Sequence, residues 1–177
     1  MLNEKRIHEA ENNVKLYLSD GLLRKITGNE SLIKLFMKNA KESLGVADKI
    51  YNDEMSDLWT IVCSYYSMYY LSNAILLKLG YKVGDKISHK VVSDALIVYV
   101  RKKLKNSFIE EYEEAKEEAL NLAGIKADSV IESFDFERIK RGLVQYKTLE
   151  VEKRSKAKTS LDRAKSFSVE INKLLIL

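Results

Sequence analysis

Apolar side chains recur along most of this chain at the three- and four-residue spacing of an α-helix. The clearest stripe predicts a helix that begins at Asn29 or Ser31, either of which could cap it, and ends near Tyr51. The same spacing predicts five further helices, at residues 4–18, 58–77, 88–100, 106–124 and from about 135 towards 177. No segment shows the alternation of a strand, so the pattern predicts only helices.

One predicted helix is free of formal charge. The segment 58–77 reads LWTIVCSYYSMYYLSNAILL, which is long enough to span a bilayer. Four tyrosines lie in its middle, however, whereas tyrosines of membrane helices gather at the two interfaces. We therefore predict the central helix of a helical bundle and no membrane partner. Its buried hydroxyls need hydrogen-bond partners, so we expect polar seams or a contact with another subunit.

Composition supports long helices with few turns. The 177 residues include no proline and 7 glycines, the two residues that most often mark turns. We predict an all-α, up-and-down bundle of about six helices in a single compact domain, with residues 1–30 as an N-terminal helical extension and 31–177 as the bundle. The single cysteine excludes an internal disulfide, and the N-terminus has no apolar core of a signal peptide, so we expect a cytoplasmic protein.

The net charge of +4 is mild, but the charges are unevenly distributed. Residues 107–120 contain six glutamates against one lysine, whereas residues 138–165 contain ten basic residues against three acidic ones. Two interpretations follow. The acidic and basic helices neutralise each other or face solvent, or the basic segment offers a surface to a polyanion.

Most enzyme signatures are missing from the sequence. It contains no glycine-rich phosphate loop and no Gly-x-Ser-x-Gly elbow. His8, Cys63 and His89 do not have the spacing of metal ligands. We therefore expect no metal site and no cofactor.

Two stretches carry a resemblance to a known family. Residues 35–78 read LFMKNAKESLGVADKIYNDEMSDLWTIVCSYYSMYYLSNAILLK, and Ser88-His89 begins the next predicted helix. Residues 141–146 read RGLVQY early in the last predicted helix. Over residues 31–177 this pattern resembles the HEPN superfamily of small prokaryotic proteins, which carries an Arg-(x)4-His motif in its last long helix.

The resemblance implies a helical bundle, most often a homodimer in which motif residues of both subunits line a shared cleft. Many members of the superfamily are metal-independent RNases, often toxins restrained by a small nucleotidyltransferase partner. For this chain the resemblance therefore implies a homodimer, a possible nucleotidyltransferase partner, and RNA or a nucleotide as ligand.

Carried onto this sequence, the motif selects Arg141 and Tyr146 as candidate catalytic residues. Arg138, Gln145 and His89 join them as candidate binding residues. The motif histidine is replaced by Tyr146, and Gln145 stands where one HEPN subgroup has aspartate before the tyrosine. An arginine suits a phosphate because its planar fork binds two oxygens, but a phenol with a pKa of about 10 is a poor general base at pH 7.

Three functions are compatible with the sequence. The first is a HEPN-like binding protein without strong catalytic activity, acting on RNA or a nucleotide, or with a nucleotidyltransferase in a two-component, toxin–antitoxin-like system. The second is a metal-independent RNase that uses Arg141 with Tyr146 or His89 as the substitute base. The third is a structural helical dimer, an interaction module whose basic last helix is neutralised by its acidic helix.

Overall fold

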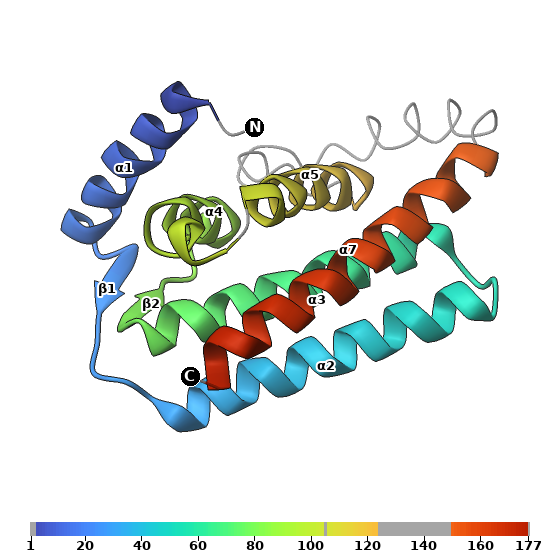
Figure 1. Ribbon diagram of the computed structural model, residues 1–177, viewed down its shortest axis with the longest axis horizontal. Helices are drawn as coiled ribbons and strands as arrows, with labels where there is room; N and C mark the ends of the chain where they lie inside the picture. Colours follow the sequence, from blue (N-terminus) through green and yellow to red (C-terminus); the bar gives the residue numbers. More distant parts are fainter. Residues whose placement is uncertain (1–2, 105, 124–149, 177) are drawn as a thin grey trace.

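The computed structural model describes residues 3–104, 106–123 and 150–176. These residues form six α-helices, one short 3-10 helix (η1) and two short strands (Figure 1). In chain order they are α1 (Glu4–Ser19), β1 (Leu23–Lys25), α2 (Glu30–Asn52), α3 (Asp57–Lys78), β2 (Tyr81–Val83), α4 (Ser88–Tyr99), η1 (Arg101–Lys103), α5 (Asn106–Leu122) and α7 (Glu150–Ile176). The predicted all-α helical bundle is confirmed.

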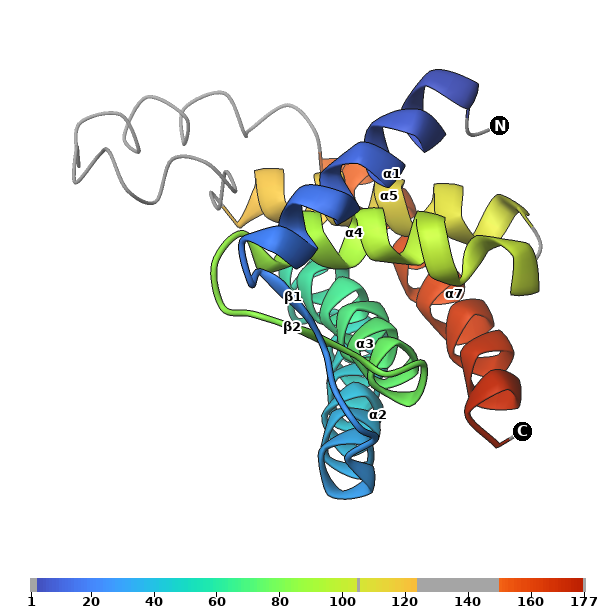
Figure 2. The same cartoon turned by 90° about the vertical axis from the view of Figure 1, so that its left-hand side faces the viewer.

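The helices pack in two groups that cross each other. α2 and α3 form an antiparallel hairpin, and α7 packs along α3 and α2 (Figure 1). α4 and α5 lie across the α3 side of this group, and α1 covers α4 (Figure 2). α3 therefore touches α2, α4, α5 and α7, and it is the central helix of the bundle.

The helix boundaries follow local capping signals. Of the two predicted caps of α2, the structure selects Asn29, whose Oδ1 accepts a hydrogen bond from the backbone N–H of Leu32 at 3.0 Å. Ser56 caps α3 in the same way, through a 3.3 Å bond from the N–H of Trp59. Gly80 follows the end of α3 at φ 84°, a left-handed conformation that glycine adopts without strain. The last helix is described from Glu150 onward, and the part predicted from about residue 135 lies outside the described residues.

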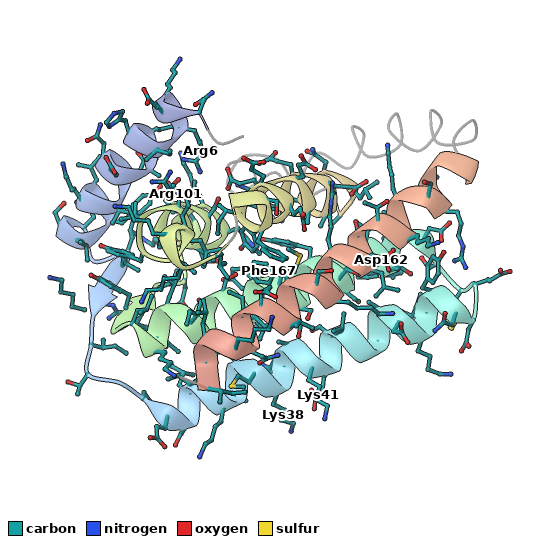
Figure 3. The ribbon with its side chains drawn as sticks, viewed as in Figure 1. Arg6, Lys38, Lys41, Arg101, Asp162 and Phe167 are labelled. Atoms are coloured by element: carbon teal, nitrogen blue, oxygen red, sulfur yellow. The ribbon has the colours of Figure 1, made fainter. Side chains whose placement is uncertain are left out.

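α3 supplies much of the core, as its uncharged sequence predicts. Fourteen of its residues are buried, and Tyr65, Met68 and Leu76 are completely enclosed. Phe167 of α7 and Tyr112 of α5 close the core from the other side, with their ring centroids 5.8 Å apart (Figure 3). None of the described helices is both long and apolar enough to cross a membrane.

The two strands correct the prediction that the chain contains only helices. β1 and β2 pair antiparallel, with Arg24 opposite Lys82, and bonds from Ile26 N to Gly80 O and from Gly84 N to Leu22 O extend the ladder. Each strand has three residues, which is too short for a period of two to emerge from a sequence. β1 and β2 are also far apart in the chain, so no hairpin turn in the sequence indicates that they pair.

Candidate functional site

Of the five predicted site residues, the structure describes His89 alone. Arg138, Arg141, Gln145 and Tyr146 lie outside the described residues. Their predicted roles therefore stay predictions. The site that can be built from the described side chains is the surrounding of His89.

His89 lies in the first turn of α4, and its ring packs onto α3. Its Nδ1 lies 2.7 Å from the Tyr65 hydroxyl, a hydrogen bond that joins the two helices. The ring centroids of His89 and Tyr69 are only 4.5 Å apart, and Tyr66 meets the imidazole edge-on at 5.9 Å. We call Tyr65, Tyr66, Tyr69 and His89 the tyrosine–histidine cluster.

The spacing of α3 and the bend before α4 produce this cluster. Residues 65, 66 and 69 lie on neighbouring turns of one side of α3, which brings their rings towards the same neighbour. Ile87, immediately before α4, has a φ of 43°, and this left-handed residue starts the helix so that residue 89 meets α3. Tyr65 is completely buried, whereas Tyr66, Tyr69 and His89 are half-buried. The cluster thus has a fixed floor and an open side.

The imidazole in this cluster is biased towards its neutral form. Burial, with the nearby Lys116 ammonium as a second cause, lowers the pKa of His89 below its ordinary value. Burial also raises the pKa of Tyr65 far above that of a free phenol, so its hydroxyl stays protonated. The Tyr65 hydroxyl occupies Nδ1, and Nε2 makes no hydrogen bond to a described residue. That nitrogen can act as a donor or an acceptor towards a ligand, depending on the tautomer.

A second polar cluster on α4 was not predicted. The Asp94 carboxylate is fully buried and faces α1: Arg6 Nη1 lies 2.7 Å from Oδ1, while the Tyr17 hydroxyl and Asn13 Nδ2 donate to Oδ2 at 2.9 and 3.0 Å. We call these four residues the Asp94 cluster. A single acid inside the apolar run VVSDALIV at residues 91–98 was the signal available in the sequence, because a buried charge needs partners.

The two clusters are linked through α5. Arg6 Nε also donates to Glu113 Oε2 at 3.1 Å, and Glu113 Oε1 lies 3.3 Å from Lys116 Nζ. Lys116 is buried, and it is the ammonium that depresses the basicity of His89. Figure 3 shows Arg6 on the side of α1 that faces α4 and α5.

The basic last helix is partly neutralised within the chain, but not by the acidic helix alone. Arg163 pairs with Glu114 of α5, whereas Lys165 pairs with Asp48 of α2. Arg154 pairs with Asp57 of α3 at 3.1 Å, donates to the Tyr51 carbonyl and lies over the Tyr51 ring. The described part of α7 is therefore a weak candidate for a polyanion surface.

Two hollows lie elsewhere on the described surface. One, of about 560 Å³, opens beside the start of α3, and another, of about 360 Å³, lies between α2 and α7. The first is lined by Glu54, Met55, Ser56, Asp57, Leu58, Lys153 and Arg154, and the second by Met37, Lys38, Ala40, Lys41, Leu44, Leu71, Ser168 and Asn172. Neither contains a residue of the tyrosine–histidine cluster. No three acid, histidine or cysteine side chains of the described residues are grouped as metal ligands.

The fold and these clusters define a helical bundle with an aromatic–imidazole site. Comparison of the chain with protein-family models, with curated proteins and with solved structures found no match. The resemblance to the HEPN superfamily, the homodimer and the nucleotidyltransferase partner therefore stay predictions.

Proposed function

We propose that this protein is a HEPN-like helical bundle that binds single-stranded RNA, and that it does so without strong catalytic activity. The tyrosine–histidine cluster is the observation that carries the proposal. It combines aromatic side chains that are only half-buried with a ring nitrogen that is available for a hydrogen bond. Those are the two elements with which proteins hold unstacked bases.

The geometry of the cluster explains why bases suit it. Tyr65 and its bond to His89 fix the imidazole, so little side-chain entropy is lost when a ligand is bound. Tyr66 and Tyr69 offer large rings with few rotatable bonds beside it. A base can stack on such a ring whatever its identity, because every base has a π face. In this proposal Arg138 and Arg141 contact phosphates, and Gln145 and Tyr146 donate hydrogen bonds to the same strand.

Alanine substitutions in the open part of the cluster test this proposal. Tyr66→Ala and Tyr69→Ala should each weaken the binding of a labelled oligouridylate by about 1–3 kcal/mol, the usual value of a stacked base. Tyr66→Phe keeps the ring and should keep the affinity, which makes it the matched control. Fluorescence anisotropy measures the affinities. Wild-type affinity in both alanine variants would contradict the proposal.

The arginine predicted by the motif gives a second, independent test. Arg141→Ala should weaken RNA binding and lower the salt dependence of log K by about 0.7, the contribution of one phosphate contact on a single strand. RNA binding that is insensitive both to salt and to this substitution would exclude the RNA-binding function.

A metal-independent RNase is a second candidate, and the state of His89 favours it. A neutral imidazole near pH 7 can accept the proton of a ribose 2′-hydroxyl, which the phenol of Tyr146 does poorly. The test is cleavage of labelled RNA in EDTA by the wild type, His89→Gln and Arg141→Ala. An RNase of this kind loses activity in both variants, whereas equal cleavage by all three proteins would mean a contaminant.

We also propose that two copies associate through the outer side of the α2–α3 hairpin. Leu35 and Val46 of α2, Met55 between the two helices and Trp59 of α3 expose about half or more of their surface, with fractions of 49, 47, 69 and 55%. Such apolar groups are costly to leave in water when they are close together. Sedimentation of the wild type and of Trp59→Glu tests the dimer. The variant should sediment as a monomer, and a wild-type monomer at micromolar concentration would contradict it.

A further inference from the structure

The two-stranded ribbon carries a charge arrangement that the fold does not need. Arg24 and Lys82 are directly opposite each other in the ladder, and both side chains are exposed. Side chains in this position have Cβ atoms about 5 Å apart, and like charges there destabilise the pair. The opposite side of the ribbon explains its place in the fold, because Leu23 is buried and Tyr81 stacks on Tyr99 at 4.1 Å.

More unpaired positive charge lies around the same ribbon. Lys86 and Lys90 follow β2 in the connection to α4 and in its first turn. Both are exposed, and none of the basic residues of this group forms an ion pair with a described residue. Asp85 is the acid in the connection, and it forms no ion pair with them.

Lysines on the neighbouring helix behave differently. On α2, Lys34, Lys38 and Lys49 each lie within 4.0 Å of an acid one turn away. Three of the four lysines of α2 are thus neutralised locally, whereas the ribbon places two cations opposite each other without a counter-charge. An anionic ligand would relieve the repulsion between Arg24 and Lys82.

The ribbon continues into the tyrosine–histidine cluster. The connection from β2 to α4 leads directly to His89, and Lys86 and Lys90 stand on either side of that residue in the sequence. Figure 2 shows this connection bulging outward on the side of α3 away from α7. From Tyr69 to the end of α3 at Lys78 is about 14 Å at the rise of an α-helix, a distance that a short oligonucleotide covers.

We propose that the β1–β2 ribbon binds the phosphodiester backbone of the RNA strand whose bases stack on the tyrosine–histidine cluster. This assignment rests on the proposed RNA-binding function and names its phosphate-binding surface. Arg24 and Lys82 are the two central contacts, and Lys86 and Lys90 extend the positive track. No residue of the basic segment 138–165 is needed for it.

The experiment compares two strands of the same length, an oligouridylate and an abasic phosphodiester oligomer. The ribbon requires only phosphates, whereas the cluster requires bases. Arg24→Gln/Lys82→Gln should lower the salt slope of log K by about 1.4 on both strands, or about 25-fold in affinity near 0.1 M salt. The control Lys38→Gln/Lys158→Gln removes the same charge from exposed sites on α2 and α7 and should keep the wild-type slope.

A single charge reversal separates binding from folding. Arg24→Glu places a carboxylate opposite Lys82, so the ribbon should become as stable as the wild type or more stable. Its affinity for both strands should nevertheless fall below that of the wild type. Wild-type affinity for both strands in this variant, at an unchanged melting temperature, would overturn the assignment.

The remaining outcomes distinguish the ribbon from the cluster. If Tyr66→Ala binds the oligouridylate normally but the ribbon variants do not, the stacking site is wrong and the ribbon assignment stands. If the ribbon variants and the control have equal slopes, the ribbon assignment is overturned and the stacking site is unaffected. Displacement of RNA by vesicles of phosphatidylglycerol, with the same dependence on Arg24 and Lys82, would overturn it in favour of a membrane surface.

Discussion

Two polar clusters lie five residues apart on the same helix, and they are built on opposite principles. Asp94 is fully buried and meets an arginine, a phenol and an amide from α1. His89 is half-buried, is driven towards its neutral form and meets aromatic rings of α3. The first cluster pairs its charged groups within the chain, while the second leaves one nitrogen and parts of two rings for a ligand. The buried and charge-paired Asp94 cluster therefore holds α1 against α4, whereas the half-buried and uncharged tyrosine–histidine cluster is the candidate binding site.

The largest expected effect comes from removing the buried carboxylate. Asp94→Ala leaves Arg6, Asn13 and Tyr17 without their common acceptor and should lower the free energy of unfolding by about 3–5 kcal/mol. Denaturant titration measures the change. Asp85→Ala, at an exposed site, is the control and should change it by less than about 0.5 kcal/mol. The folded fraction of Asp94→Ala should bind RNA with wild-type affinity. A loss of RNA binding without a loss of stability would contradict the purely structural role of the Asp94 cluster.

A smaller loss is expected when one hydrogen bond to the same carboxylate is removed. Tyr17→Phe deletes the 2.9 Å bond to Asp94 and should destabilise the fold by about 1.5–3 kcal/mol, the usual value for a bond to a charged group. Tyr70→Phe removes a hydroxyl that makes no hydrogen bond to a described residue, so it should be close to neutral. Equal free energies of unfolding for the two variants would contradict the inference that the Tyr17–Asp94 hydrogen bond stabilises the fold.

The neutral imidazole of the tyrosine–histidine cluster should affect the pH dependence of stability. The pKa of His89 is lower in the folded protein than the value of about 6.5 in the unfolded chain, so the unfolded state takes up the proton first as pH falls. The free energy of unfolding should therefore decrease as the pH is lowered from 7 through 6.5 and below. His89→Gln should reduce this decrease. An unchanged pH profile in His89→Gln would show that the imidazole is not held neutral.

The smallest effect tests the link between the two clusters. Lys116→Gln removes the ammonium that lowers the basicity of His89, so the pKa of His89 should rise, although burial still keeps it low. Proton NMR titration of the imidazole measures this pKa. Lys153→Gln, on α7, is the control. An unchanged pKa in Lys116→Gln would mean that burial alone sets the state of His89.

The helices could be predicted from the sequence because each depends on local periodicity and on a cap that lies beside it. Asn29 and Gly80 are such local signals, and the structure confirms both boundaries. The ribbon could not be predicted, since its two strands are short and their pairing depends on the tertiary fold. His89 was selected through a family resemblance, but its partner Tyr65 becomes visible only when α3 and α4 are packed together. Asp94 shows the limit most clearly, because its partners on α1 lie about eighty residues earlier.

That separation has a consequence for the order in which the chain acquires structure. α1 packs on α4, and β1 pairs with β2, so the first 25 residues find their tertiary contacts only after the chain has been synthesised through the end of α4. An isolated helix of 16 residues with few buried apolar groups is marginal in water. Residues 4–25 therefore acquire their partners only after α4 has been made, and a nascent chain paused before residue 94 would leave the Arg6 guanidinium without the Asp94 carboxylate.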